Sequence, residues 1–310
     1  MDDWSGTAFQ LPGQGAQYVG MGADLAAALP EARKLYEQAD DLLGFRLSEI
    51  CWSGPEERLR RTENAQPAIL LHSYAVWIAL PAEVRNGATV AAGHSLGEFT
   101  AYLIAGSLAF EDALRIVRRR GELMAESGRE RPGAMSAVLG LDPETVASVC
   151  QKTPGIVVPA NDNAPGQVVI SGAEEAVAEA GKRLREAGAR RVVPLNVSGA
   201  FHSPLMESAR QGLEAILNET AILDPRFPVV ANVSAEPVRS GERARQLLVA
   251  QLTGAVRWSD GVRCMASLGA VRYVEAGPGS VLTGLLRRID PALRGQAVGG
   301  VAALSSLTPG

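Results

Sequence analysis

The stretch that most constrains the fold is ATVAAGHSLGEFTAYLIAG, residues 88–106. Residues 88–93 are small and apolar, which is typical of a buried strand, and residues 96–106 have the composition of a helix. Between them GHSLG (93–97) fits G-x-S-x-G, a pattern that places a serine on a sharp turn between a strand and a helix. This predicts an α/β fold with Ser95 exposed at a strand end. A buried serine at a tight helix start would have the same letters, so the motif alone leaves both interpretations open.

A serine nucleophile needs a base, and the chain has three histidines. His72 lies in the apolar helical segment 62–80, where a packed core histidine is expected. His94 adjoins Ser95, and neighbouring side chains on a tight turn diverge, so we expect it to support the turn. His202 follows a predicted strand and precedes a predicted helix, and loops at strand ends gather catalytic groups. By elimination, His202 is the candidate base.

The middle of the chain has a different pattern of predicted strands and helices. It predicts four strands and two helices in the order β-α-β-β-α-β, which is the ferredoxin-like split unit. The predicted strands are 134–140, 155–161, 166–172 and 190–197, and the helices are 142–153 and 173–188. Because this unit is complete in one central block, we expect an inserted subdomain at 132–198. Residues 1–131 and 199–310 would then form one large domain.

The flanking segments predict the other elements of that domain. Strands are expected at 7–11, 227–233 and 271–279, and helices at 21–40, 62–80, 203–218, 240–254 and 281–289. The helix 62–80 is predicted to be capped by Thr62 or Asn64. The last 20 or so residues are rich in Ala, Gly and Ser and are expected to be loosely held.

An arginine stands out in the helical segment 110–127, FEDALRIVRRRGELMAES. Its apolar stripe comprises Phe110, Ala113, Leu114, Val117, Gly121 and Met124. Arg120 lies on that stripe, three residues after Val117, whereas its charged neighbours lie on the opposite face. A buried guanidinium needs an anionic partner. That partner is either an internal Asp or Glu or the carboxylate of a substrate held by the bidentate fork.

Composition excludes several classes of function. The net charge of −4 and the pI of about 5.6 argue against nucleic-acid binding. The longest apolar run, 67–80, is interrupted by His72 and Ser73 and is shorter than a membrane span. The acidic N-terminal stretch does not have the pattern of a signal peptide. Three widely spaced cysteines predict neither a disulfide framework nor a zinc site and suit a reducing cytosol.

Several motifs together resemble one family, the malonyl-CoA:acyl carrier protein transacylases and the acyltransferase domains of polyketide synthases. The matching segments occur in order over about residues 7–290. They are PGQGAQ (12–17), GHSLGE (93–98), RRGELM (119–124), NDNAPGQVVISG (161–172), AFHSPLM (200–206), QLTGAVRW (251–258) and EAGPGSVLTGL (275–285). The resemblance implies an α/β-hydrolase-like domain with a parallel sheet, interrupted by a ferredoxin-like subdomain.

The resemblance also implies roles for single residues. Ser95 would be the nucleophile, His202 the base and Arg120 the holder of the free malonyl carboxylate. The backbone carbonyl of Gln251 would orient the histidine in place of a third acidic residue. The oxyanion hole would use the backbone N–H groups of Gln14 and Leu96. Asn161 matches a polar position near the site, and Phe201 would crowd a branch methyl and favour malonyl over methylmalonyl.

The implied reaction moves a malonyl group from malonyl-CoA, through a malonyl-serine ester, to the phosphopantetheine thiol of an acyl carrier protein, in fatty acid or polyketide synthesis. The implied enzyme needs no metal or other cofactor and is cytoplasmic. Three alternatives remain: a serine thioesterase or hydrolase, the malonyl-loading subunit of a malonate decarboxylase, and a catalytically silent docking subunit. Carrier proteins are acidic, so a basic docking patch is also a hypothesis. Its candidates are Arg129, Arg131, Lys182, Arg183, Arg185, Arg190 and Arg191.

Overall fold

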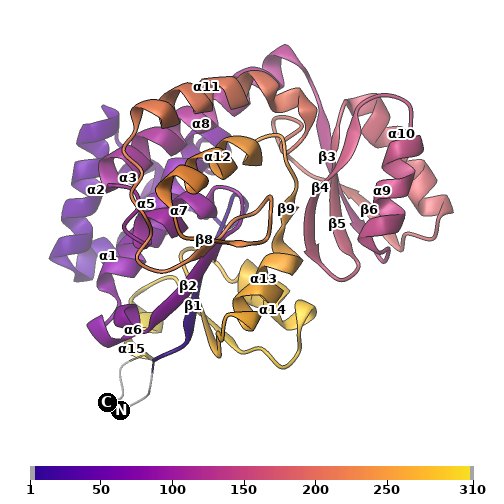
Figure 1. The fold of residues 1–310 in the computed structure, drawn as a ribbon. Helices are drawn as coiled ribbons and strands as arrows, with labels where there is room; N and C mark the ends of the chain where they lie inside the picture. Colours follow the sequence, from indigo (N-terminus) through magenta and orange to yellow (C-terminus); the bar gives the residue numbers. More distant parts are fainter. Residues whose placement is uncertain (1–3, 308–310) are drawn as a thin grey trace.

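The larger of two β-sheets carries the predicted serine turn (Figure 1). The structure is a computed structural model that describes residues 4–307. The strand order in this sheet is β11-β10-β1-β2-β7-β8, and every pair is parallel except the β7–β8 hairpin. The strands are β1 (Thr7–Leu11), β2 (Ala88–Gly93), β7 (Val229–Val230), β8 (Pro237–Val238), β10 (Arg272–Ala276) and β11 (Gly295–Val298).

Helices cover both faces of this sheet, which is why its central strands are apolar on both sides. On one face, Phe9 and Leu11 join the main core with α5 (Thr62–Ala79), α7 (Gly97–Ile104) and α8 (Phe110–Glu130). On the other face, residues such as Ala8 pack with α13 (Trp258–Ser267) and α14 (Val281–Ile289). The other helices are α1 (Ala23–Ala28), α2 (Pro30–Leu43), α3 (Leu47–Ser53), α4 (Glu56–Arg60), α6 (Ala82–Asn86), α11 (Glu207–Glu219), α12 (Gly241–Gln251) and α15 (Val301–Ser305).

The second sheet has the predicted β-α-β-β-α-β order. It consists of β3 (Ala134–Leu139), α9 (Pro143–Lys152), β4 (Val157–Ala164), β5 (Gln167–Gly172), α10 (Glu174–Glu186) and β6 (Arg191–Pro194). The antiparallel strands are ordered β6-β3-β5-β4. Val168 and Ile170 pack under the two helices, whereas Val169 between them faces the main core. This period-two alternation leaves one face of the sheet for the large domain.

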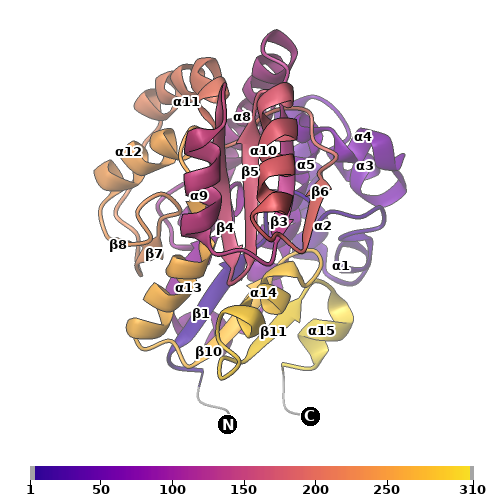
Figure 2. The ribbon, with the colours of Figure 1, turned by 90° about the vertical axis from the view of Figure 1, so that its right-hand side faces the viewer.

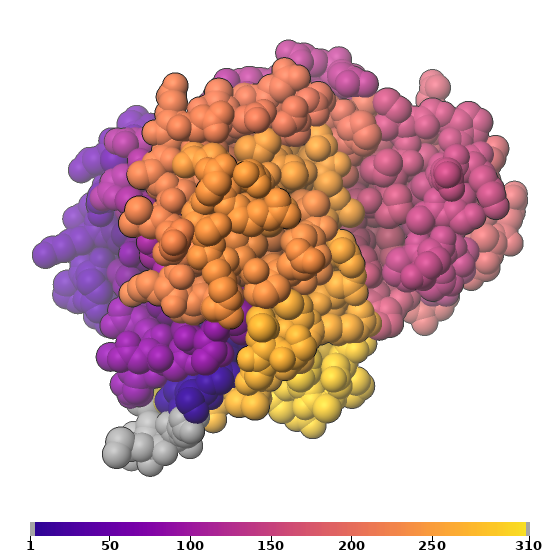
Figure 3. Space-filling view, in the orientation of Figure 1, coloured from indigo at the N-terminus to yellow at the C-terminus, as the bar shows by residue number. Residues whose placement is uncertain are grey.

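One short strand of the large domain joins the second sheet. In β9 (Val256–Arg257), Val256 pairs in parallel with Asn161 of β4. Figure 2 shows α9 and α10 on the outer side of this sheet, away from the large domain. In the space-filling view, the C-terminal third of the chain lies directly against the block formed by residues 134–194 (Figure 3). The domain bounds 1–131, 132–198 and 199–310 stay a prediction.

Several expectations about single elements were wrong. Residues 21–40 form two helices, because Pro30 begins a new helix and ends the preceding one. The N-cap of α5 is Arg61, without a side-chain capping bond, and not Thr62 or Asn64. Residues 295–298 form the edge strand β11, and α15 (Val301–Ser305) follows, so this segment is held by regular secondary structure. Among the described helices, none is long and apolar enough to cross a membrane.

Candidate active site

The serine turn is held in a strained backbone conformation. Ser95 has φ 52°, in the left-handed region that L-residues rarely adopt. A Cβ at Gly93 would lie 1.9 Å from the carbonyl group of Gly97, and a Cβ at Gly97 would lie 2.1 Å from the carbonyl oxygen of Leu11. Both positions therefore require glycine for steric reasons. The turn presents Ser95 at the carboxyl end of β2, where α7 begins.

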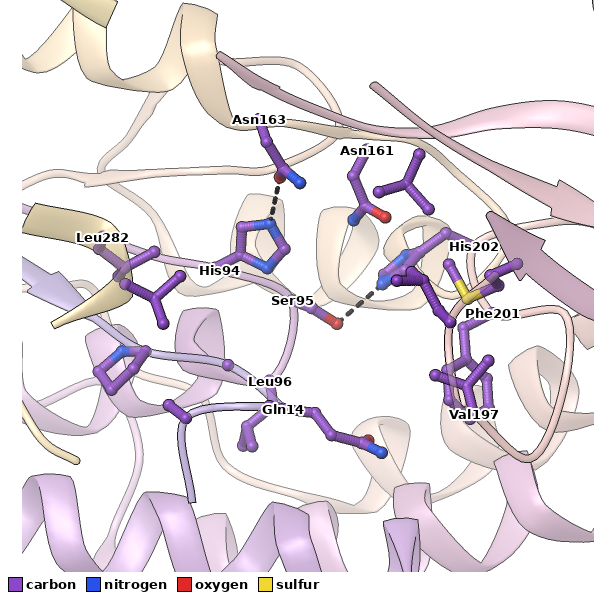
Figure 4. A pocket seen from close by; sticks show the side chains of 18 of the residues that line it. Gln14, His94, Ser95, Leu96, Asn161, Asn163, Val197, Phe201, His202 and Leu282 are labelled. Atoms are coloured by element: carbon purple, nitrogen blue, oxygen red, sulfur yellow. Dashed lines mark hydrogen bonds between the residues drawn. The ribbon is translucent and has the colours of Figure 1, made fainter. Parts of the chain in front are cut away.

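Ser95 and His202 lie in hydrogen-bond contact, although 107 residues separate them in the chain. Ser95 Oγ is 2.8 Å from His202 Nε2 (Figure 4). His202 Nδ1 is 2.8 Å from the carbonyl oxygen of Gln251 and 3.2 Å from that of Gly254. Because carbonyl oxygens only accept, Nδ1 carries the proton and Nε2 is free to accept one from the serine. Burial, and then the charge of Arg120, lower the pKa of His202 to about 3, so the ring is neutral at physiological pH.

Arg120 is buried on α8 and points at the same serine. Its guanidinium donates to Gln66 Oε1 at 2.7 Å, to Gln251 Oε1 at 2.9 Å and to Ser95 Oγ at 3.2 Å. No carboxylate among the described residues lies within ion-pair distance of it. Burial lowers the pKa of Arg120, and the negative charge of Glu98 opposes that effect. A buried guanidinium without a direct anionic partner is suited to bind an anion that enters the cleft.

Three buried polar side chains behind the serine were not predicted from the sequence. Asn232 Oδ1 accepts from Ser95 N at 2.7 Å, and Asn232 N donates to Glu98 Oε2 at 3.0 Å. The Gln251 side chain donates to Ser95 O at 3.0 Å and to Glu98 Oε2 at 2.6 Å. Asn232 follows the carboxyl end of β7, and functional residues gather at such strand ends, so its position could have indicated a role in the site. Glu98 and Gln251 lie inside the matching segments 93–98 and 251–258, but nothing in those segments indicated a role for either side chain.

The two predicted oxyanion donors lie close to the serine. Leu96 is the N-cap of α7, where backbone N–H groups lack intrahelical partners and the helix dipole favours negative charge. Gln14 lies in the loop after β1, and its side-chain Oε1 accepts from Thr62 Oγ1 at 2.8 Å. Within residues 4–307, neither the Gln14 nor the Leu96 N–H is engaged by another group. Figure 4 shows both residues on the same side of Ser95.

A cavity of about 260 Å³ opens beside these groups and is lined from both sheets. Asn161 and Phe201, the two predicted substrate contacts, both lie in its wall and are almost fully buried. His94 also lines it, and its Nε2 is 2.8 Å from Asn163 Oδ1, so this ring links the serine turn to β4 (Figure 4). His72 is a core residue, 3.3 Å from the Tyr36 hydroxyl, as predicted. Over the described part of the chain, no cluster of three or more His, Cys, Asp or Glu side chains is placed to hold a metal ion.

A serine at a strand–helix turn, paired with a neutral histidine and facing a buried arginine, defines the class: an α/β protein with an acyl-transfer type of site. The acyl transferase domain family matches residues 8–296, and the chain belongs to this family. The malonyl CoA-acyl carrier protein transacylase of Bacillus subtilis (strain 168) is 41% identical over 296 residues, which cover 94% of this chain and 92% of that protein.

Two solved structures are similar along nearly the whole chain. An acyl carrier protein S-malonyltransferase from Vibrio cholerae superposes with a TM-score of 0.93 and 39% identity, and the match covers 98% of this chain and 100% of that one. A malonyl-transacylase in complex with a type II polyketide acyl carrier protein gives a TM-score of 0.93 and 42% identity. That match covers 97% of this chain and 98% of the other.

Proposed function

We propose that this protein transfers malonyl groups from malonyl-CoA to the phosphopantetheine thiol of an acyl carrier protein, for fatty acid or polyketide synthesis. The observation that carries the proposal is the meeting of Ser95, His202 and Arg120 at one cavity, with contacts of 2.8 and 3.2 Å to the serine hydroxyl. The relatives named malonyl transacylases support the choice of acyl group and acceptor.

The first half-reaction forms a malonyl-serine ester. The malonyl carboxylate binds Arg120, which fixes the thioester carbonyl near Ser95 Oγ. His202 Nε2 removes the serine proton as Oγ attacks, and the resulting oxyanion is stabilised by the N–H groups of Gln14 and Leu96. The carbon–sulfur bond then breaks, and the CoA thiolate takes the proton from His202. In the second half-reaction the carrier thiol gives its proton to His202 and attacks the ester, and the serine oxygen leaves and is reprotonated.

Arg120 also affects the base. Its positive charge contributes to the low pKa of His202 in the free protein. A substrate carboxylate on the guanidinium offsets that charge, so the imidazole becomes a stronger base once the malonyl group is bound. An acetyl group, which has no free carboxylate, lacks this effect. The arginine therefore favours the malonyl group in binding and in the proton transfer that follows.

The walls of the cavity set the shape of the acyl group. Phe201 lies beside His202 and would crowd a methyl branch, which favours malonyl over methylmalonyl. Asn161 of β4 offers an amide in the cavity wall for polar contact with the substrate. No step in this scheme requires a metal or redox cofactor, and the proposed setting is the cytoplasm, where CoA thioesters and carrier proteins meet.

The test is intact-protein mass spectrometry with malonyl-, methylmalonyl- and acetyl-CoA, with and without a carrier protein. We expect a mass increment of one malonyl group on the protein, lost in Ser95→Ala and transferred when carrier is added. The hydrolase alternative predicts that malonyl-CoA is consumed without any carrier. The malonate decarboxylase alternative predicts the same label but transfer only to a different carrier. A label that persists in Ser95→Ala would move the nucleophile elsewhere.

A further inference from the structure

Glu98 is a fully buried carboxylate that the scheme above does not use. It lies in the first turn of α7, three residues after the serine. Its Oε2 accepts from Gln251 Nε2 at 2.6 Å and from Asn232 N at 3.0 Å. Its Oε1 is buried without a hydrogen-bond partner among the described residues. An ionised carboxylate with hydrogen bonds to only one of its two oxygens is costly to bury, so a positive charge has to lie nearby.

The balancing charge is Arg120, and one amide joins the two groups. Gln251 Nε2 donates to Glu98, and Gln251 Oε1 accepts from Arg120 at 2.9 Å. Burial raises the pKa of Glu98 to about 7, while its two hydrogen bonds and the charge of Arg120 act in the opposite direction. Both charges therefore lie in a poorly screened interior, where they act on each other and on any third charge.

We propose that Glu98 is a specificity-determining, positioning residue: its ionised carboxylate competes, through the Gln251 amide, with the acyl carboxylate for the charge of Arg120. This inference rests on the proposed function, because it takes the ligand of Arg120 to be the malonyl carboxylate. When that carboxylate binds, the cleft holds two negative charges and one positive charge. The repulsion is relieved when Glu98 takes up a proton. The charge state of Glu98 thus sets how strongly carboxylated acyl groups are bound.

Few other titratable groups surround Glu98. Of the elements packed against α7, strands β1, β2 and β7 contain no titratable side chain. The helix α5 contributes Gln66, the other partner of Arg120. The ionisable residues of α5 are Glu63, His72 and Tyr74; His72 contacts Tyr36, and none of the three acts on the pKa of Glu98. Tyr102, one turn along α7, feels the charge of Glu98, and Arg243 of α12 acts on Tyr102 in turn. Arg120 is thus the cation that acts on Glu98 itself.

Glu98→Gln isolates the charge. The amide oxygen can accept both hydrogen bonds now made by Oε2, and the amide nitrogen replaces the oxygen that has no partner. At pH 8 we expect KM for malonyl-CoA to fall about fivefold, with kcat/KM for acetyl-CoA unchanged. At pH 6, where Glu98 of the parent protein is protonated, the two proteins should converge. Gln66→Glu, which adds an anion beside Arg120, should raise KM for malonyl-CoA.

Binding to Ser95→Ala gives a readout without turnover. Calorimetric titration with malonyl-CoA at pH 8, in two buffers that differ in ionisation enthalpy, should show proton uptake. That uptake should be absent in Ser95→Ala/Glu98→Gln, which separates Glu98 from His202 as the proton acceptor. A merely structural role would change malonyl and acetyl transfer equally, and that result would overturn the inference, as would unchanged proton uptake. If the parent protein neither binds nor transfers malonyl groups, the proposed function fails instead.

Discussion

The two sheets contribute to the cleft in different ways. The parallel sheet is covered on both faces and contributes the ends of its strands: the serine turn after β2 and the Gln14 loop after β1, with Asn232 after β7 supporting the serine from behind. The antiparallel sheet has helices on one face and contributes part of the other, through residues such as Met135 and Val169. We infer that the nucleophile and its oxyanion donors come from the first sheet, that the base His202 comes from the loop after β6, and that the wall formed by the second sheet shapes the acyl pocket. Substitutions should separate these two contributions.

The largest effect is expected at the nucleophile and its base. Ser95→Ala or His202→Ala should lower kcat/KM for malonyl transfer by a factor of ~10⁴ or more, because nucleophile and base act as one unit. The double variant should be no worse than either single one. Steady-state kinetics with malonyl-CoA and carrier protein measure this. Additive losses would contradict a shared role.

Arg120→Ala should come next. Truncating one member of a buried charge pair costs a factor of about 10² to 10³ in malonyl transfer. Acetyl transfer should be spared or improved, because it does not use the guanidinium. The ratio of the two kcat/KM values is the measurement. Equal loss for both acyl groups would show that Arg120 is structural.

Acid should destabilise the protein through the histidines, all of which lie outside residues 134–194. Burial lowers the pKa of His72 to about 4. Between pH 6.5 and 4 the unfolded chain therefore binds a proton at this site that the folded chain does not. The free energy of unfolding decreases as the pH is lowered through this range. His72 alone should account for about 2.4 kcal/mol between pH 7 and 4.5. Urea unfolding at both values, with His72→Gln as the control that lacks this contribution, tests the sign and size.

Changes in the cavity wall away from the serine should be smaller and should alter selectivity. Phe201→Ala enlarges the cavity and should improve methylmalonyl transfer about tenfold relative to malonyl, because pocket contacts of this size discriminate only weakly. Asn161→Ala should mainly raise KM. Competition between the two CoA thioesters in one reaction measures the ratio. A loss of kcat as large as that of His202→Ala would mean that Phe201 or Asn161 also takes part in catalysis.

The smallest effect concerns carrier docking. Lys182 and Arg183 on α10 both lie near Glu179, which already neutralises part of their charge. Reversing both charges should raise KM for the carrier only a few-fold and weaken its dependence on salt, with malonyl loading of Ser95 unchanged. Titration of the carrier at two ionic strengths measures this. If KM for the carrier responds neither to the charge reversal nor to ionic strength, the docking-patch hypothesis is wrong.

Local sequence patterns were enough to predict several parts of the fold and of the site. The strand–turn–helix at Ser95 follows from the sterics of two glycines, and the β-α-β-β-α-β unit follows from periods of two and 3.6 residues. The position of Arg120 on an apolar stripe also placed it in the core. His202 could be chosen by elimination, because only three histidines exist.

Tertiary structure alone decided which polar groups meet in the core. Gln251 reaches Ser95 across 156 residues of chain, and Asn232 reaches it across 137, so no local period records either contact. Residues 295–298 are ordered as β11 only because β10 offers them a free edge. Nothing in the sequence around Glu98 indicates that one of its carboxylate oxygens lacks a hydrogen-bond partner or that Arg120 lies nearby. Such contacts depend on how whole helices and strands pack, whereas a turn or a stripe depends on neighbours a few residues away.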